Sequence, residues 1–216
     1  MRNWPENQVI LVMIRHGAAK SNREHRYLGK EDEPLSEEGR RELAEYKSLG
    51  CYPAVDGLFV SPMKRCVQTA EILYPGLTPV CIKEWEEMDF GEFEGKNYQE
   101  LREDKRYQKW IDSGGTLPFP GGEGREDFSL RCEKGFRKMM EKAGIAKKAG
   151  PGKKGKSVKT LGMIVHGGTI MALMERYAGG NYFDYQAANG KGYLCTCMSR
   201  SLESGIEPVI IKQRKI

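Results

Sequence analysis

The sequence has little histidine, no paired cysteine motif and no long apolar segment. Only three of its 216 residues are histidines, and its six cysteines are scattered, with no C-x-x-C pair. A chain of this length can bury a core without disulfides, so the cysteines indicate a reduced, cytoplasmic setting. The early apolar stretch that ends at Arg15 is too short for a signal peptide or a membrane span. We therefore expect neither export nor membrane anchoring.

Charge is ordinary except in one segment. Apolar residues make up 39% and charged residues 30%, a balance typical of a folded globular protein, and the net charge is +5. Six lysines and no acid fall within 147–159 (KKAGPGKKGKSVK). We interpret this segment as a solvated connector, with a basic rim that attracts anionic substrates as the alternative. Because no aromatic residues are interleaved with the lysines, we do not expect nucleic-acid binding.

Strand and helix signals alternate along the chain. Apolar, β-branched runs predict strands, and capping residues with helical spacing predict helices after Ser36 and near Pro62. The predicted strands are 8–14, 57–60, 79–82 and 158–165. This alternation is typical of βαβ units, so we expect an α/β fold with three layers and a mainly parallel central sheet flanked by helices.

The second half of the chain adds two features to this plan. Asn97 and Glu100 form a capping-box pattern that predicts a helix through about residue 111, and a second helix is expected over about 125–143. Residues 97–143 therefore form a helical excursion between strands. The segments 192–199 and 206–212 predict an edge hairpin near the C-terminus. We expect residues 1–216 to form a single domain, and the oligomeric state, monomer or homodimer, stays open.

Two of the three histidines stand where an apolar strand breaks off into glycine, at His16-Gly17 and His166-Gly167. In parallel α/β sheets, ligands bind where loops leave the carboxyl ends of the strands. Arg15 lies beside His16, and Arg65 follows the second predicted strand. Guanidinium groups bind two oxygens at once, and helix N-termini add backbone donors, so this set suits a phosphoryl group.

Two other hydrolytic sites fit less well. Zinc prefers three or four histidine, cysteine or carboxylate ligands at short spacing, and arginines in the same place would repel it. A serine hydrolase would carry a G-x-S-x-G turn after a strand, and the sequence contains none. We therefore expect no metal and no cofactor.

Four motifs extend this reading into a family resemblance. The segments IRHGAAKSN, SPMKRCVQTA, EEMDFGEFEG and IVHGG occur in that order between Ile14 and Gly168. Their order resembles the histidine phosphatase superfamily, which includes cofactor-dependent phosphoglycerate mutases. The resemblance implies that His16 is the nucleophile and Glu87 the proton donor to the leaving oxygen. It implies phosphate or substrate contacts for five further residues: Arg15, Arg65, His166, Asn22 and Gly167.

The resemblance leaves some residues without a role. The neighbouring acids Glu84, Glu86 and Glu92 are expected at the surface, and His25 is expected to be an ordinary loop residue. Ala18-Ala19 stand near a position where many members have a hydroxyl, so one minor phosphate contact is absent from the pattern.

The surrounding sequence favours hydrolysis. The phrase DFGEFEG and the PGGE turn resemble the small phosphatase branch, which includes α-ribazole phosphatase-like and broad-specificity members, and the longer insertion that mutases tend to carry is missing. We expect a metal-independent phosphomonoester hydrolase that acts through a phosphohistidine on a small phosphorylated metabolite. Mutase-type phosphoryl transfer and a non-catalytic phosphate-binding module are the alternatives.

Overall fold

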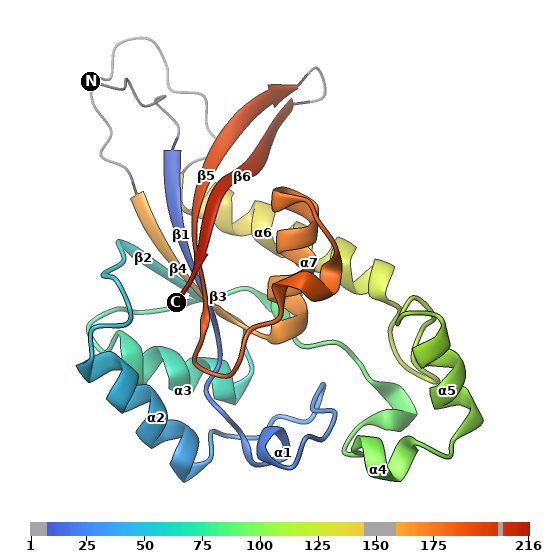
Figure 1. The fold of residues 1–216 in the computed structure, drawn as a ribbon. Helices are drawn as coiled ribbons and strands as arrows, with labels where there is room; N and C mark the ends of the chain where they lie inside the picture. The colour runs from blue at the N-terminus through green and yellow to red at the C-terminus, as the bar shows by residue number, and fades with distance from the viewer. Residues whose placement is uncertain (1–7, 145–158, 203–204) are drawn as a thin grey trace, which may run out of the picture.

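A six-stranded sheet with the order β3-β2-β4-β1-β5-β6 runs through the molecule. The computed structural model describes residues 8–144, 159–202 and 205–216. Strands β1 to β4 pair in parallel, whereas β5 and β6 form an antiparallel hairpin at one edge (Figure 1). The predicted α/β class, the mainly parallel sheet and the C-terminal hairpin are confirmed. The strands are β1 (Gln8–Arg15), β2 (Gly57–Val60), β3 (Val80–Cys81), β4 (Lys159–Val165), β5 (Gly192–Leu202) and β6 (Gly205–Lys215).

The central strands are largely apolar because both faces of the sheet are covered. Along β1, Leu11 and Met13 face one core cluster, and Val12 and Ile14 face the other. Helices α2 (Glu37–Ser48) and α3 (Lys64–Leu73) cover the second face, while α6 (Arg125–Lys142) and α7 (Gly167–Ala178) cover the first (Figure 1). The three predicted layers follow from this alternation.

Capping explains where several helices begin. Ser36 caps α2 by accepting the amide of Gly39 at 3.0 Å, as predicted. The helix expected from about Pro62 begins at Lys64, and its first amide donates to Asp32 Oδ1 at 2.7 Å. The N-terminus of α3 is therefore already occupied by a carboxylate.

The helical excursion is interrupted where one helix was predicted. Asn97 and Glu100 do form the expected capping box, but α4 ends after one turn (Tyr98–Leu101). Asp104 then caps a separate helix, α5 (Lys105–Asp112), by accepting the amide of Arg106 at 2.8 Å. The prediction of one helix to residue 111 is wrong because a second capping residue lies inside it.

Some elements were not predicted, and one prediction lies outside the described residues. Helix α7 and the short segments α1 (Lys20–Arg23), η1 (Lys83–Trp85), η2 (Gly91–Phe93) and η3 (Tyr182–Tyr185) were not expected. The basic connector 147–159 lies outside the described residues except for its last one, which begins β4. In the described part of the chain, no helix is long and apolar enough to cross a bilayer.

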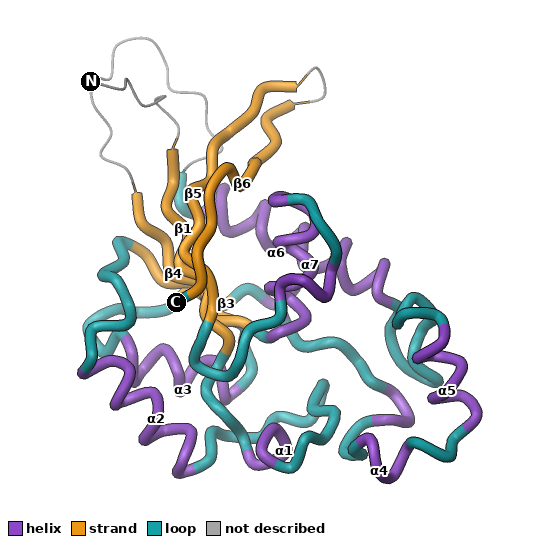
Figure 2. The backbone as a smooth tube through the Cα atoms, in the orientation of Figure 1, coloured by secondary structure: helices purple, strands orange, loops and turns teal. Residues whose placement is uncertain are grey.

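The loops that follow the parallel strands leave the sheet at one end (Figure 2). Arg15 is in register with Val165, and Val60 is in register with Ile164, so β1, β2 and β4 end side by side. The residues immediately after these strands are therefore brought together.

Candidate active site

His16 follows β1 and is almost completely buried, with 2% of its surface exposed. Its Nδ1 lies 2.7 Å from the carbonyl oxygen of Gly17, which can only accept, so Nδ1 carries the ring proton. Burial lowers the pKa of His16 well below its usual value, and the charges of Arg65 and Arg15 lower it further. The imidazole is therefore neutral, with its Nε2 lone pair available for attack.

His166 lies beside His16 at the end of β4. The two ring centroids are 5.1 Å apart with an interplanar angle of 66°. His166 Nε2 is 2.8 Å from the hydroxyl oxygen of Ser61, the first residue after β2. Burial, followed by the charge of Arg65, lowers the pKa of His166 well below its usual value, so this ring is also neutral.

His166 is the residue immediately before α7, so the first turn of this helix lies next to the His166 ring. The first amides of an α-helix have no partner within the helix and favour an anion. Gly167, which the resemblance assigned to substrate binding, is the first residue of this helix. A Cβ built on Gly167 would lie 3.5 Å from Arg15 Nε, so the helix start and the Arg15 guanidinium are neighbours.

Arg65 is buried and Arg15 is partly buried, and the Nε atom of each is buried without a hydrogen-bond partner among the residues that the structure describes. Arg65, fully buried, donates to the carbonyls of Gly29 at 3.0 Å and Glu31 at 2.9 Å. Arg15 donates to the carbonyl of Ala187 at 2.8 Å. Backbone carbonyls accept hydrogen bonds from the guanidinium groups but do not neutralise their charge. A charge removed from water is costly unless it is paired. A phosphate group would supply both the counter-charge and the acceptors.

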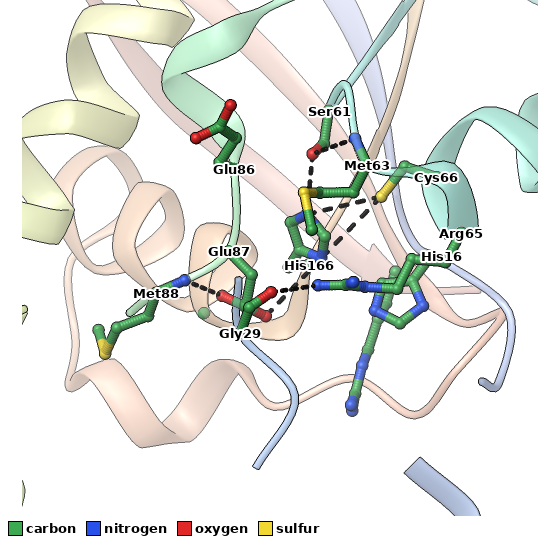
Figure 3. Close-up of polar contacts among 12 residues, drawn as sticks. His16, Gly29, Ser61, Met63, Arg65, Cys66, Glu86, Glu87, Met88 and His166 are labelled. Atoms are coloured by element: carbon green, nitrogen blue, oxygen red, sulfur yellow. Dashed lines mark hydrogen bonds and ion pairs between the residues drawn. The ribbon is translucent and has the colours of Figure 1, made fainter. Parts of the chain in front are cut away.

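Glu87 is the acid that reaches this group (Figure 3). Its Oε2 is 3.8 Å from His166 Nδ1, and its other oxygen accepts the amide of Met88 at 2.9 Å. Burial raises the pKa of Glu87, although the Met88 amide and the charges of Arg65 and Arg15 oppose the rise. A carboxyl with this shift can stay protonated and act as an acid.

The neighbouring acids were expected at the surface, but only Glu92 is exposed, while Glu84 and Glu86 are partly buried. Glu84 pairs with Lys138, and Glu92 pairs with Arg106 at 2.7 Å. Glu86 points away from the group formed by Glu87 and His166 (Figure 3).

Asn22 joins the site through a neighbour. Its Oδ1 accepts the amide of Ala19 at 3.0 Å and lies 3.4 Å from Asn189 Nδ2. Asn189 in turn donates to the backbone carbonyl of His16 at 3.0 Å. The Asn22 carbonyl is thus held by protein donors, which leaves its amide nitrogen for another acceptor.

Two hydroxyl residues position the site and were not assigned a role from the sequence. Ser61 bonds His166, and Thr69 Oγ1 accepts the amide of Gly17 at 3.0 Å while donating to the carbonyl of Arg65 at 2.7 Å. Thr69 lies four residues after Arg65, one helical turn along α3, but its bond to Gly17 spans 52 residues and no local spacing indicated it. Thr69 therefore ties the loop that begins at His16 to the helix that carries Arg65.

The side chains at this site do not suit a metal ion. Within residues 8–144, 159–202 and 205–216, no group of three or more histidine, cysteine, aspartate or glutamate side chains could hold one. The cluster instead combines a neutral imidazole, one buried and one partly buried guanidinium group, and a carboxyl whose pKa is raised. These groups together suit the transfer of a phosphoryl group.

Comparison with known proteins gives a consistent family match. Residues 11–197 match the model of the histidine phosphatase superfamily (branch 1). The chain is 30% identical over 173 residues to the uncharacterized phosphatase PhoE of Bacillus subtilis strain 168, covering 79% of this chain and 78% of that protein. It is also 30% identical over 177 residues to a 2,3-bisphosphoglycerate-dependent phosphoglycerate mutase of Gloeobacter violaceus, covering 76% and 74%.

Solved structures show the same fold. The crystal structure of the α-ribazole phosphatase from Shigella flexneri superposes with a TM-score of 0.70 at 22% identity, covering 94% of this chain and 95% of that one.

Proposed function

The chain belongs to branch 1 of the histidine phosphatase superfamily, and from that premise we propose that it hydrolyses phosphomonoesters through a phosphohistidine formed on His16. The observation that carries the proposal is the state of His16: buried, neutral, and with Nδ1 donating to the Gly17 carbonyl so that Nε2 is free. Mere phosphate binding needs no nucleophile prepared in this way. Because the six cysteines are free, we also propose a reduced, cytoplasmic setting for the protein.

The first step transfers the phosphoryl group to the enzyme. The Nε2 lone pair attacks phosphorus, the bond from phosphorus to the ester oxygen breaks, and Glu87 gives its proton to that oxygen. Negative charge grows on the remaining phosphate oxygens, where Arg15, Arg65 and the first amides of α7 would stabilise it without rearranging. His166 lies beside the transferring group as a neutral ring.

The second step restores the enzyme. Water attacks the phosphohistidine, the bond between phosphorus and Nε2 breaks, and the ionised Glu87 takes the proton that water releases. Inorganic phosphate leaves, His16 is again neutral, and Glu87 is again protonated. The same two residues thus serve both steps, with Glu87 acting first as acid and then as base.

Hydrolysis and mutase-type transfer share the first step, so the acceptor decides between them. The phosphatase-like DFGEFEG and PGGE segments and the similarity to a Bacillus subtilis phosphatase support water as the acceptor. The similarity to a phosphoglycerate mutase supports the alternative.

The test is to supply both acceptors at once. We expect wild-type protein in EDTA to release inorganic phosphate from a panel of phosphomonoesters, and to do so at nearly the same rate when a phosphoglycerate is added. Transfer to the phosphoglycerate with little phosphate released would favour the mutase. If the protein neither releases phosphate nor transfers it, the non-catalytic phosphate-binding module would be the remaining interpretation.

The pKa shifts at the site predict a bell-shaped pH profile. His16 must be neutral, so activity falls when the pH drops below its pKa, and burial moves that limb to lower pH. Glu87 must be protonated, so activity falls when the pH rises above its pKa, and burial moves that limb upward. With ordinary values, near 6.5 for histidine and 4.3 for glutamate, the two requirements would barely overlap. The opposite shifts widen the window in which both hold.

We therefore expect kcat/KM to be greatest at mildly acidic to neutral pH. The measurement is kcat/KM for one monoester across the acidic and basic range, with stability checked at each pH. A flat profile would contradict the pairing of His16 with Glu87.

A further inference from the structure

Arg131, on α6, holds the irregular segment that carries Glu87. Its Nη1 donates to the carbonyls of Glu84 at 2.9 Å and Glu86 at 2.8 Å, and its Nη2 lies 3.4 Å from the carbonyl oxygen of Glu87 itself. One guanidinium group thus binds three carbonyls within four residues. A point charge such as an ammonium group could not reach all of them at once.

Glu123 completes the arrangement from the turn before α6. Its carboxylate accepts from Arg131 Nε at 3.0 Å and from Nη2 at 2.7 Å, a two-point pairing that fixes the plane of the guanidinium. Both side chains are largely buried, with 28% and 18% exposed. The amide of Glu123 also donates to the carbonyl of Asp89 at 2.9 Å. The segment from Glu84 to Asp89 is therefore held at both ends.

The two loops also touch through their backbones. A Cβ on Gly122 would lie 2.4 Å from the Asp89 carbonyl oxygen, and one on Gly91 would lie 2.2 Å from that of Pro120. Both glycines are needed because real Cβ atoms do not approach so closely. The PGGE turn and the segment after Glu87 therefore fit together with little freedom to shift.

We propose that Arg131 and Glu123 are positioning residues that hold the Glu87 carboxyl where it protonates the leaving oxygen. This inference rests on the proposed hydrolysis. Neither side chain needs to touch the substrate, because Arg131 acts on the backbone of Glu87 and Glu123 acts on Arg131. Proton transfer depends steeply on the distance between donor and acceptor, so a small displacement of Glu87 slows the steps in which it gives or takes a proton. In the first step, which determines kcat/KM, only esters whose leaving group needs a proton are affected.

The leaving group provides the test. Phenoxide is a poor leaving group that needs a proton, whereas 2,4-dinitrophenoxide leaves without one. For Arg131→Lys, we expect kcat/KM to fall about 10- to 100-fold with phenyl phosphate, a part of what a general acid usually contributes. With 2,4-dinitrophenyl phosphate we expect a fall of less than about 3-fold, since no proton is required. Glu123→Gln keeps the shape of the side chain and removes its charge. It should show the same pattern, with a larger fall in kcat/KM for phenyl phosphate than for 2,4-dinitrophenyl phosphate.

Arg137→Lys is the matched control. Arg137 lies on the same helix and pairs with Glu133 at 2.6 Å, on a more exposed surface. Among the described residues, Arg137 makes no hydrogen bond to residues 84–89, so kcat/KM should be unchanged for both esters. Circular dichroism and melting temperature report whether each variant is folded.

The outcomes separate the two proposals. Equal losses with both esters, or no loss in either variant, would overturn the positioning role while leaving the hydrolase intact. If Arg131→Lys does not fold, Glu123→Gln decides by the same comparison. A wild-type protein that cleaves neither ester would instead refute the hydrolysis on which the inference rests.

Discussion

His16→Ala is expected to lower kcat/KM for phosphomonoester hydrolysis by about 10⁵-fold or more, the scale seen when a covalent nucleophile is removed. The remaining arginines and Glu87 could still bind the substrate and protonate the leaving group. Without Nε2, however, no enzyme atom would be placed to accept the phosphoryl group. The measurement is phosphate release from the best substrate of the monoester panel, with folding checked because the ring is buried.

His25→Asn is the matched control for this prediction. His25 is exposed and adopts a φ of 55°, a conformation that asparagine tolerates well. We expect its activity to stay within about 2-fold of wild type, as is usual for exposed positions away from a site. If folded His16→Ala kept a tenth of the activity, the nucleophile would have to be another group.

Glu87→Gln should lower kcat/KM by about 10²- to 10⁴-fold for a monoester with a poor leaving group. Glutamine has the same shape and can still accept the Met88 amide, so the fold should be preserved. It has no acidic proton to give, so the loss should be far smaller with 2,4-dinitrophenyl phosphate. The basic limb of the pH profile should also disappear, because that limb reports ionisation of Glu87.

Glu86→Gln provides the control, since Glu86 is adjacent in sequence but points away from the site (Figure 3). It should leave kcat/KM and both limbs of the profile unchanged. A basic limb that persisted in Glu87→Gln would assign that ionisation to another group, and an equal loss with both esters would remove the acid role from Glu87.

The fold was predictable where the pattern is local. The continuous apolar run of β1 indicates a strand covered on both faces, and the serine before α2 indicates its start. Helix α7 was missed because its first residues are two glycines, which are poor helix formers. The break between α4 and α5 depends on Asp104, which caps α5. In the sequence alone, Asp104 looks like any other acidic residue at the surface.

The site divides in the same way. His16, Arg65 and His166 could be proposed because each directly follows a strand or begins a helix, and their chemistry is distinctive. Ser61 and Thr69 act through hydrogen bonds to residues 105 and 52 positions away, which no local pattern specifies. Arg131 is similar, because its partners are backbone carbonyls and any sequence supplies those.

The most direct test of the account is to trap the covalent intermediate. Wild-type protein mixed with a rapidly cleaved ester, quenched within milliseconds and kept at alkaline pH, should carry one phosphoryl group on His16 by peptide mass spectrometry. Glu87→Gln with 2,4-dinitrophenyl phosphate should carry more of it, because the base for the second step is missing. Phosphate release with no phosphorylated His16 in either protein, at times when turnover is under way, would contradict the phosphohistidine route.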